Sequence, residues 1–263
     1  MVQLETIKTH NLKITWEKLP DDFILPDEPV DNLLQPLLAS ALRESLELAG
    51  LILESMLIAT NFGIVAKVGD KTVVKAPDWV YIPSVKPITQ GVIRRSYTPN
   101  LEGDKPTIVM EFISETEGGE YSINPHYPYG KWYFYEQILE VPIYIIFHPK
   151  TGELDFYRLQ DRKYILQKPE KNNYYFIEEI GLYLGIWKGE KSQINTYWLR
   201  WWDQDDNLLL WGNELIALEK QRAEIEKQQA EEVKLLLNQE KNYRQKLLNK
   251  LTEMGINIDT LNQ

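Results

Sequence analysis

Two apolar runs enclose one helical segment near the middle of the chain: Thr107-Ile-Val-Met-Glu-Phe-Ile-Ser114, then about Lys131 to Glu140, then Val141-Pro-Ile-Tyr-Ile-Ile-Phe147. The first run is rich in the branched and aromatic residues that favour strands. The last run is apolar without alternation, which is typical of a strand that is buried on both faces. The order strand, helix, strand therefore predicts a sheet that helices cover.

The segments before this centre predict a helix followed by several strands. Apolar residues recur at helical spacing from Asp31 to Ala49, and Gly50 stands where a left-handed C-terminal cap belongs. Pro36 fits only near the start of this helix, because proline lacks the amide hydrogen that a helix interior needs. Strands are then expected over three segments: Gly50 to Ile58, Phe62 to Val68 and Thr72 to Ile82. The elements predict an α/β (α+β) fold.

The section after the central strand is rich in aromatic residues and strand-like from Leu154 to Trp211. Its most concentrated cluster is Trp198-Leu-Arg-Trp-Trp202. We expect these tryptophans to pack in a core or an interface rather than to stack on nucleobases. The pattern predicts a β-rich extension over about residues 165–212, which completes a first domain of residues 1–212.

The C-terminal tail, residues 213–263, is predicted to be a separate helical domain. Glycine and proline are absent from Asn213 to Lys250, where Glu, Lys, Gln, Arg, Leu and Ala dominate. The leucines follow an interrupted heptad-like stripe, which predicts a short, imperfect coiled coil and a homodimer or another form of self-association. The alternative is a solitary charged helix that leans on its own domain.

The composition restricts the classes of function. The 263 residues include no cysteine, which excludes disulfides, thiolate metal sites and a cysteine nucleophile. A net charge of -10 argues against a surface that binds nucleic acid through bulk electrostatics. The start, Met1-Val-Gln-Leu-Glu5, does not resemble a signal peptide, and no apolar run has the length of a membrane span. We expect a cytoplasmic protein without membrane association.

Most familiar catalytic motifs are missing from the sequence. It has three histidines, no Gly-x-Ser-x-Gly elbow and no glycine-rich phosphate loop. Two carboxylates remain, because Asp78 lies inside a strand-like run and Glu111 lies in the apolar centre of another. A buried carboxylate is costly unless it is paired or binds a cation, and Mg²⁺ prefers oxygen ligands. Lys131, at the start of the next helix, would place an ammonium group beside such a metal site.

Each of these residues also has a structural interpretation. Asp78 after Pro77 would be a bulge or turn residue, Glu111 would form an internal ion pair with an arginine, and Lys131 would be an ordinary cation at a helix start. Spacing alone leaves both interpretations open.

Several motifs resemble one protein family. They are Lys75-Ala-Pro-Asp-Trp79, Arg94-Arg-Ser-Tyr-Thr-Pro99, Val109-Met-Glu-Phe-Ile-Ser114, Gly119-Glu-Tyr-Ser122, Pro128-Tyr-Gly-Lys131 and Phe134-Tyr-Glu136. They are similar to the Uma2 family, also called domain of unknown function 820 and described as restriction endonucleases. The similarity covers about residues 16–164, and the aromatic extension resembles a cyanobacterial subgroup.

The resemblance implies a PD-(D/E)XK nuclease core, in which helices flank a mixed central sheet. It implies that Asp78 and Glu111 are the metal ligands, with Mg²⁺ (or Mn²⁺) as the cofactor. The parent motif has a lysine two residues after the second acid, where this chain has Ile113. In Uma2-like proteins a lysine on the following helix takes that role, which implies Lys131.

Further residues are weaker candidates for the same site. Related nuclease folds recruit an acid from the first helix region, where Glu28 or Asp31 would serve. Ser114, Tyr135 and Gln137 are candidates for supporting the metal ligands, and helix packing is the competing role for the last two.

The leading functional prediction is a Mg²⁺-dependent endonuclease that hydrolyses phosphodiester bonds in DNA, with Asp78, Glu111 and Lys131 as catalytic residues. The alternative is an inactive nuclease-fold module that acts in protein assembly or nucleic-acid binding. Basic residues occur at Lys67, Lys71 and Lys75 and at Arg94-Arg95, and they are expected to form a solvated edge more than a track for phosphates.

Overall fold

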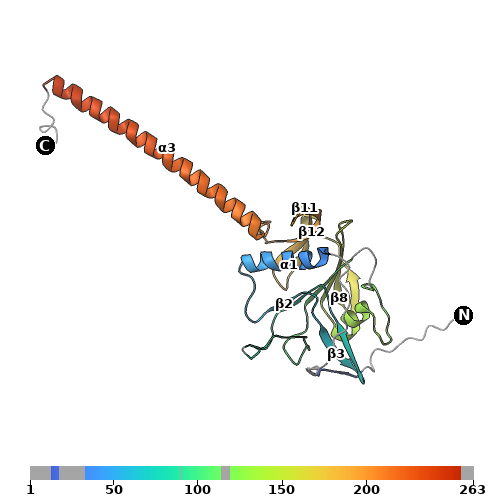
Figure 1. Ribbon diagram of the computed structural model, residues 1–263. Coiled ribbons are helices and arrows are strands. Elements are labelled where there is room, and N and C mark those ends of the chain that lie inside the picture. Colours follow the sequence, from blue (N-terminus) through green and yellow to red (C-terminus); the bar gives the residue numbers. More distant parts are fainter. Residues whose placement is uncertain (1–12, 18–32, 90, 114–118, 256–263) are drawn as a thin grey trace. The chain divides into compact units, whose positions relative to one another are not determined.

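One mixed sheet forms the centre of the fold (Figure 1). The computed structural model describes residues 13–17, 33–89, 91–113 and 119–255. Six strands lie in the order β2-β5-β6-β7-β8-β9. They are β2 (Leu57–Ala59), β5 (Trp79–Ile82), β6 (Ile108–Phe112), β7 (Ile143–His148), β8 (Glu153–Gln160) and β9 (Lys163–Leu166). β6 and β7 are parallel, whereas every other pair of neighbours is antiparallel.

The parallel pair confirms the predicted order of strand, helix and strand. Parallel neighbours require a crossover connection, and here it contains α2 (Lys131–Tyr133) and the π-helical turn η2 (Phe134–Leu139). Alternation along β6 then separates two cores. Ile108, Met110 and Phe112 belong to one apolar cluster, whereas Val109 belongs to the other.

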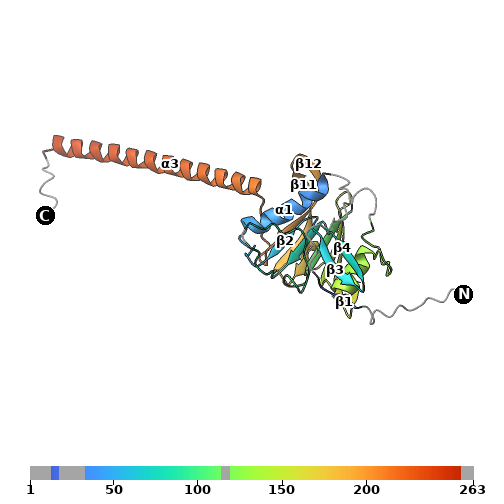
Figure 2. The ribbon, with the colours of Figure 1, turned by 60° about the horizontal axis from the view of Figure 1, so that its bottom comes forward.

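The first core is closed by α1 (Leu34–Leu48) and by a three-stranded sheet. The strands of that sheet are β10 (Tyr175–Ile177), β11 (Leu182–Lys191) and β12 (Ile194–Trp202), and a short 3-10 turn, η3 (Lys171–Asn173), precedes them. α1 lies between β11 and β12 on one side and the central sheet on the other (Figures 1 and 2). The aromatic extension therefore covers the helix that covers the sheet.

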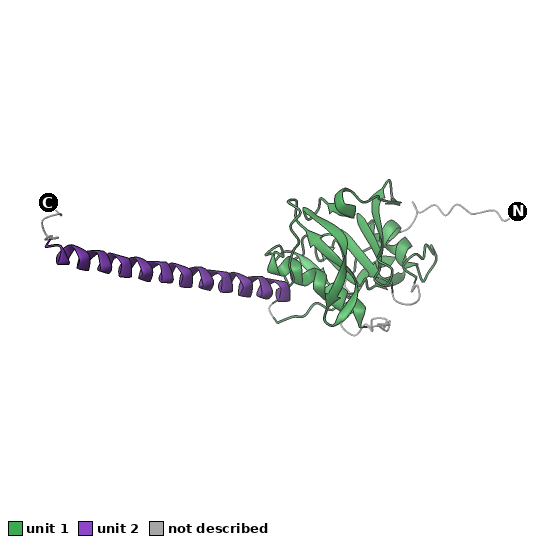
Figure 3. Cartoon of the chain, turned by 90° about the horizontal axis from the view of Figure 1, so that it is seen from above, with its two compact units in different colours: residues 1–211 green, residues 212–263 purple. Residues whose placement is uncertain are grey.

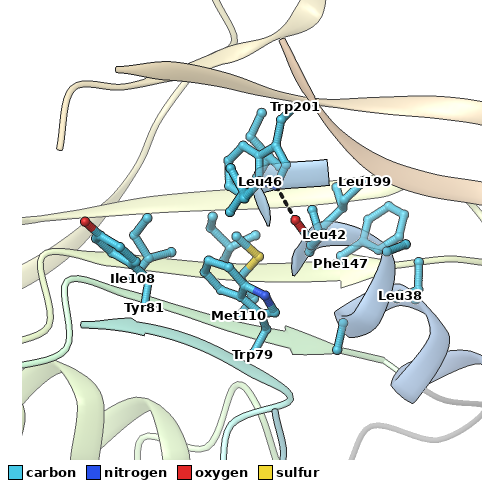
Figure 4. Packing of buried hydrophobic residues seen from close by; sticks show 14 of the residues in the cluster. Leu38, Leu42, Leu46, Trp79, Tyr81, Ile108, Met110, Phe147, Leu199 and Trp201 are labelled. Carbon is cyan, nitrogen blue, oxygen red and sulfur yellow. Dashed lines mark hydrogen bonds between the residues drawn. The ribbon is translucent and has the colours of Figure 1, made fainter. Parts of the chain in front are cut away.

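Tryptophan side chains tie this extension to α1. Trp201 Nε1 donates to the carbonyl oxygen of Leu42 at 3.1 Å, and its ring packs among the leucines of α1 (Figure 4). Trp211 Nε1 donates to the carbonyl oxygen of Ala41 at 3.2 Å. Trp198 and Trp201 are fully buried, which confirms the prediction that this cluster packs rather than stacks on bases.

The second core lies on the opposite face of the sheet, under the crossover. Phe134, Tyr135, Ile138 and Leu139 of η2 are buried there. A small sheet of β1 (Ile14–Thr15), β3 (Ile64–Val68) and β4 (Lys71–Lys75) contributes to the same cluster.

The predicted helix at the start is confirmed, because α1 begins at Leu34 with Pro36 in its first turn and Gly50 follows its end at φ +70°. The strand predicted from Gly50 to Ile58 is largely wrong, since β2 begins at Leu57. Leu53 there is 57% exposed and lies in a turn closed by the bond from Met56 N to Leu53 O. The apolar side chain of Leu53 is therefore not a sign of a buried strand.

The run predicted as one strand from Thr72 to Ile82 is two strands, β4 and β5, which belong to different sheets. Ala76-Pro-Asp78 separates them. Proline has no amide hydrogen to donate to a ladder, so the chain leaves one sheet at Pro77 and enters the next one after Asp78.

The described chain divides into two compact units, residues 1–211 and residues 212–263 (Figure 3). The second unit contains α3 (Gly212–Glu253), which confirms the predicted long helix. No residue of α3 is buried. The coiled coil stays a prediction. None of the described helices combines the length and apolar character that crossing a membrane would require.

Candidate active site

The site is built around Glu111, a fully buried carboxylate on the sheet. Along β6 the side chains alternate, so Glu111 shares a face with Val109 and is directed toward the crossover helix. β5 and β6 pair with Trp79 opposite Met110, and continuing this register brings Asp78 level with Glu111. The structure thus brings together the two acids that are 33 residues apart in the sequence.

Asp78 is held in place by the backbone of the neighbouring strand. Its Oδ2 accepts a hydrogen bond from the Phe112 amide at 2.6 Å. Gln35 of α1 donates from Nε2 to the carbonyl oxygen of the same Phe112 at 2.7 Å. The start of α1 therefore reaches the edge of the site through Gln35, a residue that sequence reasoning missed.

Lys131 enters the site from the crossover. Its Nζ lies 3.2 Å from Glu111 Oε2 and 3.7 Å from Glu120 Oε1, and its side chain is 12% exposed. Gly130 precedes it, and a Cβ added there would lie 2.0 Å from the carbonyl oxygen of Ser122. Only glycine permits this close approach of two backbones, which fixes where the helical segment begins.

Tyr135 binds the other oxygen of Glu111. It lies one turn after Lys131, and its hydroxyl donates to Glu111 Oε1 at 3.0 Å. The π-helical turn begins at Phe134, between the two residues that reach Glu111. Single π-helical turns are frequent at functional sites. This contact favours the supporting role predicted for Tyr135 over packing alone.

Burial has the largest single effect on the pKa values of both Glu111 and Lys131. Burial and, to a smaller extent, the carboxylates of Asp78 and Glu120 raise the pKa of Glu111, the Lys131 ammonium and the Tyr135 hydrogen bond lower it, and the net value is about 8. Burial lowers the pKa of Lys131, but the surrounding carboxylates together raise it above its ordinary value, so the ammonium stays charged. Burial and the charge of Glu111 also raise the pKa of the Tyr135 hydroxyl, which stays a hydrogen-bond donor.

Glu120 is a third carboxylate at the site, with a role that sequence reasoning did not assign. It is 7% exposed, and the Tyr144 hydroxyl donates to its carbonyl oxygen at 2.8 Å. Its Oε2 is buried and has no hydrogen-bond partner among the described residues. The signal was present in the motif Gly119-Glu-Tyr-Ser122, but no periodicity pointed this glutamate at the sheet.

Other predicted residues lie elsewhere or outside the described residues. Gln137 donates to Glu136 Oε2 at 2.7 Å and to the Arg162 carbonyl oxygen at 2.6 Å, so it packs the helical turn rather than supporting Glu111. Glu28, Asp31 and Ser114 lie outside the described residues.

The predicted basic residues form contacts within the protein. Lys67 Nζ lies 2.7 Å from Glu17 Oε2, and Arg94 Nη1 lies 2.6 Å from Glu102 Oε1. Lys71 lies over the Tyr127 ring. The Arg94 side chain is only 12% exposed, so it does not lie on a solvated edge, and for the other basic residues the solvated edge stays a prediction.

A mixed sheet that presents two carboxylates and a lysine to one helical crossover defines a restriction-endonuclease-like class of protein. The model of the Uma2 family, described as "Putative restriction endonuclease", matches residues 19–187, which is more than half of the chain. The chain therefore belongs to the Uma2 family. Membership indicates a nuclease, and families of this class generally use divalent metal ions. No curated protein matches the chain.

The donor set at the site fits a hard divalent cation. Asp78 and Glu111 supply carboxylate oxygens, and Mg²⁺ typically takes one or two protein carboxylates while water and substrate phosphate complete its shell. Glu120 Oε2 is a buried oxygen whose partner is missing among the described residues. Within these described ranges, no group of three or more His, Cys, Asp or Glu residues is arranged as a metal site. The residues therefore fit an ion that substrate helps to hold.

Proposed function

We propose that this protein is a Mg²⁺-dependent endonuclease that hydrolyses phosphodiester bonds in DNA. One observation carries the proposal: a fully buried glutamate, Glu111, contacts the lysine at 3.2 Å and lies level with a second acid on the neighbouring strand. Burying charges in this way is costly and rarely improves stability over apolar packing. Perturbed, paired groups of this kind cluster at functional sites.

In this proposal Asp78 and Glu111 hold Mg²⁺, which when bound supplies Lewis acidity to the phosphodiester. Lys131 places a positive charge where negative charge develops on the phosphate, and its fixed position avoids reorganisation during the reaction. Tyr135 holds Glu111 Oε1 and thereby fixes the carboxylate plane. The Phe112 amide fixes the Asp78 carboxylate by donating a hydrogen bond to its Oδ2.

DNA is the proposed substrate because the family indicates a nuclease. The net charge of -10 opposes a polyanion, so DNA binding requires a local device. Lys131 and a divalent cation at the carboxylates would supply that device. Mn²⁺ is the expected substitute for Mg²⁺, since it accepts the same oxygen ligands.

The test combines calorimetric titration of Mg²⁺ and Mn²⁺ with a plasmid-nicking assay on the full chain. The double variant Asp78→Asn/Glu111→Gln removes both charges with little change in shape. A matched control, Glu153→Gln/Asp161→Asn, removes two exposed charges. We expect binding and nicking to disappear together in the first variant and to persist in the control. Nicking that survives in the first variant, with its fold confirmed by circular dichroism, would overturn the proposal.

The second candidate is an inactive nuclease-fold module for assembly or nucleic-acid binding. The observation that favours it is that Ile113 replaces the strand lysine while Lys131 already pairs with Glu111. In such a module the Lys131–Glu111 ion pair would only hold the crossover helix against the sheet. The same titration separates the two candidates, because a wild-type protein that binds neither ion, with or without DNA, supports the module.

We also propose that the protein self-associates through α3, since this 42-residue helix has no buried residue. A helix owes most of its stability to packing of its apolar side chains, so we expect α3 to pack them against another helix.

A further inference from the structure

Charge is distributed unevenly along α3. Its first half, residues 212–232, contains six acidic and three basic residues, whereas its second half, residues 233–253, contains two acidic and five basic residues. The two halves therefore carry opposite net charges of equal size. Every residue from 219 to 247 is exposed, so these charges lie on the surface of the helix.

The helix macrodipole does not account for this distribution. The macrodipole favours acids in the first turn and bases in the last turn, and its influence ends there. In α3 the first turn holds one acid, Glu214, and the last turn holds one base, Lys250. Six of the eight acidic residues of α3 lie at or before Glu232, and five of its eight basic residues lie at or after Lys234. The asymmetry thus extends over the whole length of the helix.

Apolar side chains gather in three exposed or half-exposed groups along α3. They are Leu215, Ile216 and Leu218 near the start, Val233, Leu235, Leu236 and Leu237 in the middle, and Leu247, Leu248 and Leu251 near the end. Val233 is 64% exposed and Leu236 is 56% exposed. A full parallel overlap places each group level with its own counterpart. A full antiparallel overlap places the first group level with the last, and the middle group level with residues 228–232, one residue from its own counterpart. The apolar groups therefore favour pairing, and the charges distinguish its two directions.

We infer that α3 pairs with α3 of a second copy of this chain and that the two helices run antiparallel. This inference rests on the self-association proposed above and is independent of the nuclease activity. An antiparallel overlap places the acidic half of each helix beside the basic half of its partner, whereas a parallel overlap places like charges together. Charges flanking an apolar seam set partner and orientation in helical pairs. The apolar group near the start of one helix then meets the group near the end of the other.

Spin-label distances test the direction. The chain contains no cysteine, so Gln221→Cys, Glu232→Cys and Gln245→Cys each give one labelling site in the full chain. These residues are exposed and lie outside the apolar groups. With a rise of 1.5 Å per residue, a full antiparallel overlap separates the two labels at 221 by about 35 Å and those at 245 by about 38 Å along the axis. The labels at 232 lie nearly level, at roughly the interaxial distance of 10 Å.

Three outcomes are distinguishable. Long distances at both ends with a short distance in the middle support the antiparallel pair. Short distances at all three sites overturn the antiparallel direction but leave self-association in place. A monomer by sedimentation velocity, without intermolecular coupling at any site, overturns self-association and the antiparallel inference together, and leaves the nuclease proposal standing.

Charge reversal tests whether the charges of the two halves of α3 select the pairing. Lys241→Glu/Arg244→Glu/Lys246→Glu makes both halves acidic and should raise the dimer dissociation constant by at least about tenfold. Mixing this variant with Glu219→Lys/Glu224→Lys/Glu226→Lys should restore a heterodimer, because one helix is then acidic and the other basic along its length. The control Lys241→Arg/Lys246→Arg keeps the charge and should dimerise as the wild type does. An unchanged dissociation constant in the acidic variant, with helix content intact, would show that charge does not select the pairing.

Discussion

Lys131 Nζ lies 3.2 Å from Glu111 Oε2 although the lysine belongs to the crossover helix and the glutamate to a strand. Positions 109, 111 and 113 share one face of the sheet, and Ile113 packs in the cluster under the crossover. A lysine at position 113 would therefore approach Glu111 from the same side as Lys131 does. The helix supplies the ammonium group that the strand lacks.

Removing this ammonium should abolish most of the proposed activity while the protein still folds. We expect Lys131→Met to lower the nicking rate by at least about a hundredfold, because one fixed charge at the phosphate is worth that much in comparable sites. The control Lys105→Met removes a lysine that pairs with Glu140 at 3.0 Å in a more exposed place. Equal rates for both variants and the wild type, measured on supercoiled plasmid, would leave Lys131 with a structural role only.

Moving the lysine to the strand should restore activity. Because positions 113 and 131 serve the same face, the double variant Ile113→Lys/Lys131→Met should nick plasmid at least about tenfold faster than Lys131→Met alone. Ile113 is 7% exposed, so each variant's fold must be checked by its thermal transition. A folded double variant that is as slow as Lys131→Met would show that the site needs the helix lysine specifically.

Metal affinity should rise with pH up to about 8. Burial raises the pKa of Glu111 to about 8, so below this pH the carboxyl holds a proton that a metal ion must displace. Lys131 does not titrate in this range, because the neighbouring carboxylates keep its pKa above the ordinary value of 10.5. The apparent affinity for Mn²⁺ should increase about tenfold per pH unit from pH 6 and level off above pH 8. Calorimetry in two buffers of different ionisation enthalpy would detect the released proton.

The raised pKa of Glu111 also determines how the stability of the metal-free protein changes with pH. The pKa of Glu111 in the folded state lies above its ordinary value of 4.5, so its contribution to stability is fully present below pH 4.5 and is lost as the pH rises through 8. The Glu111→Gln variant cannot titrate at this position. Its unfolding midpoint should therefore fall less than that of the wild type between pH 6 and pH 9, and identical slopes would contradict the shift.

Periodicity predicted the parts of the fold that local sequence determines. α1, β6, the crossover and β7 follow from apolar spacing, because each buries its apolar residues in a regular element. The break at Pro77 entered only as the alternative of a bulge or turn at Asp78, since the residues on both sides of it favour strands equally. Asp78 and Glu111 could be suspected because carboxylates are rare in apolar runs. Glu120 was missed although its motif was noted, because no apolar periodicity surrounds it and the Tyr144 bond to its carbonyl oxygen forms only in the folded chain.

Glu120 gives the last prediction. Its Oε1 lies 3.7 Å from Lys131 Nζ, so Lys131 lies between two carboxylates. If Glu120 positions the lysine, Glu120→Gln should lower the maximal nicking rate by roughly tenfold and leave Mn²⁺ affinity nearly unchanged. If Glu120 holds the ion through its buried Oε2, affinity should fall at least as much as the rate. We expect the first result, because Asp78 and Glu111 already supply the two carboxylates that Mg²⁺ typically takes from a protein. Glu153→Gln, an exposed neutralisation on β8, controls for the change in net charge, and an affinity loss confined to Glu120→Gln would reassign Glu120 to the metal.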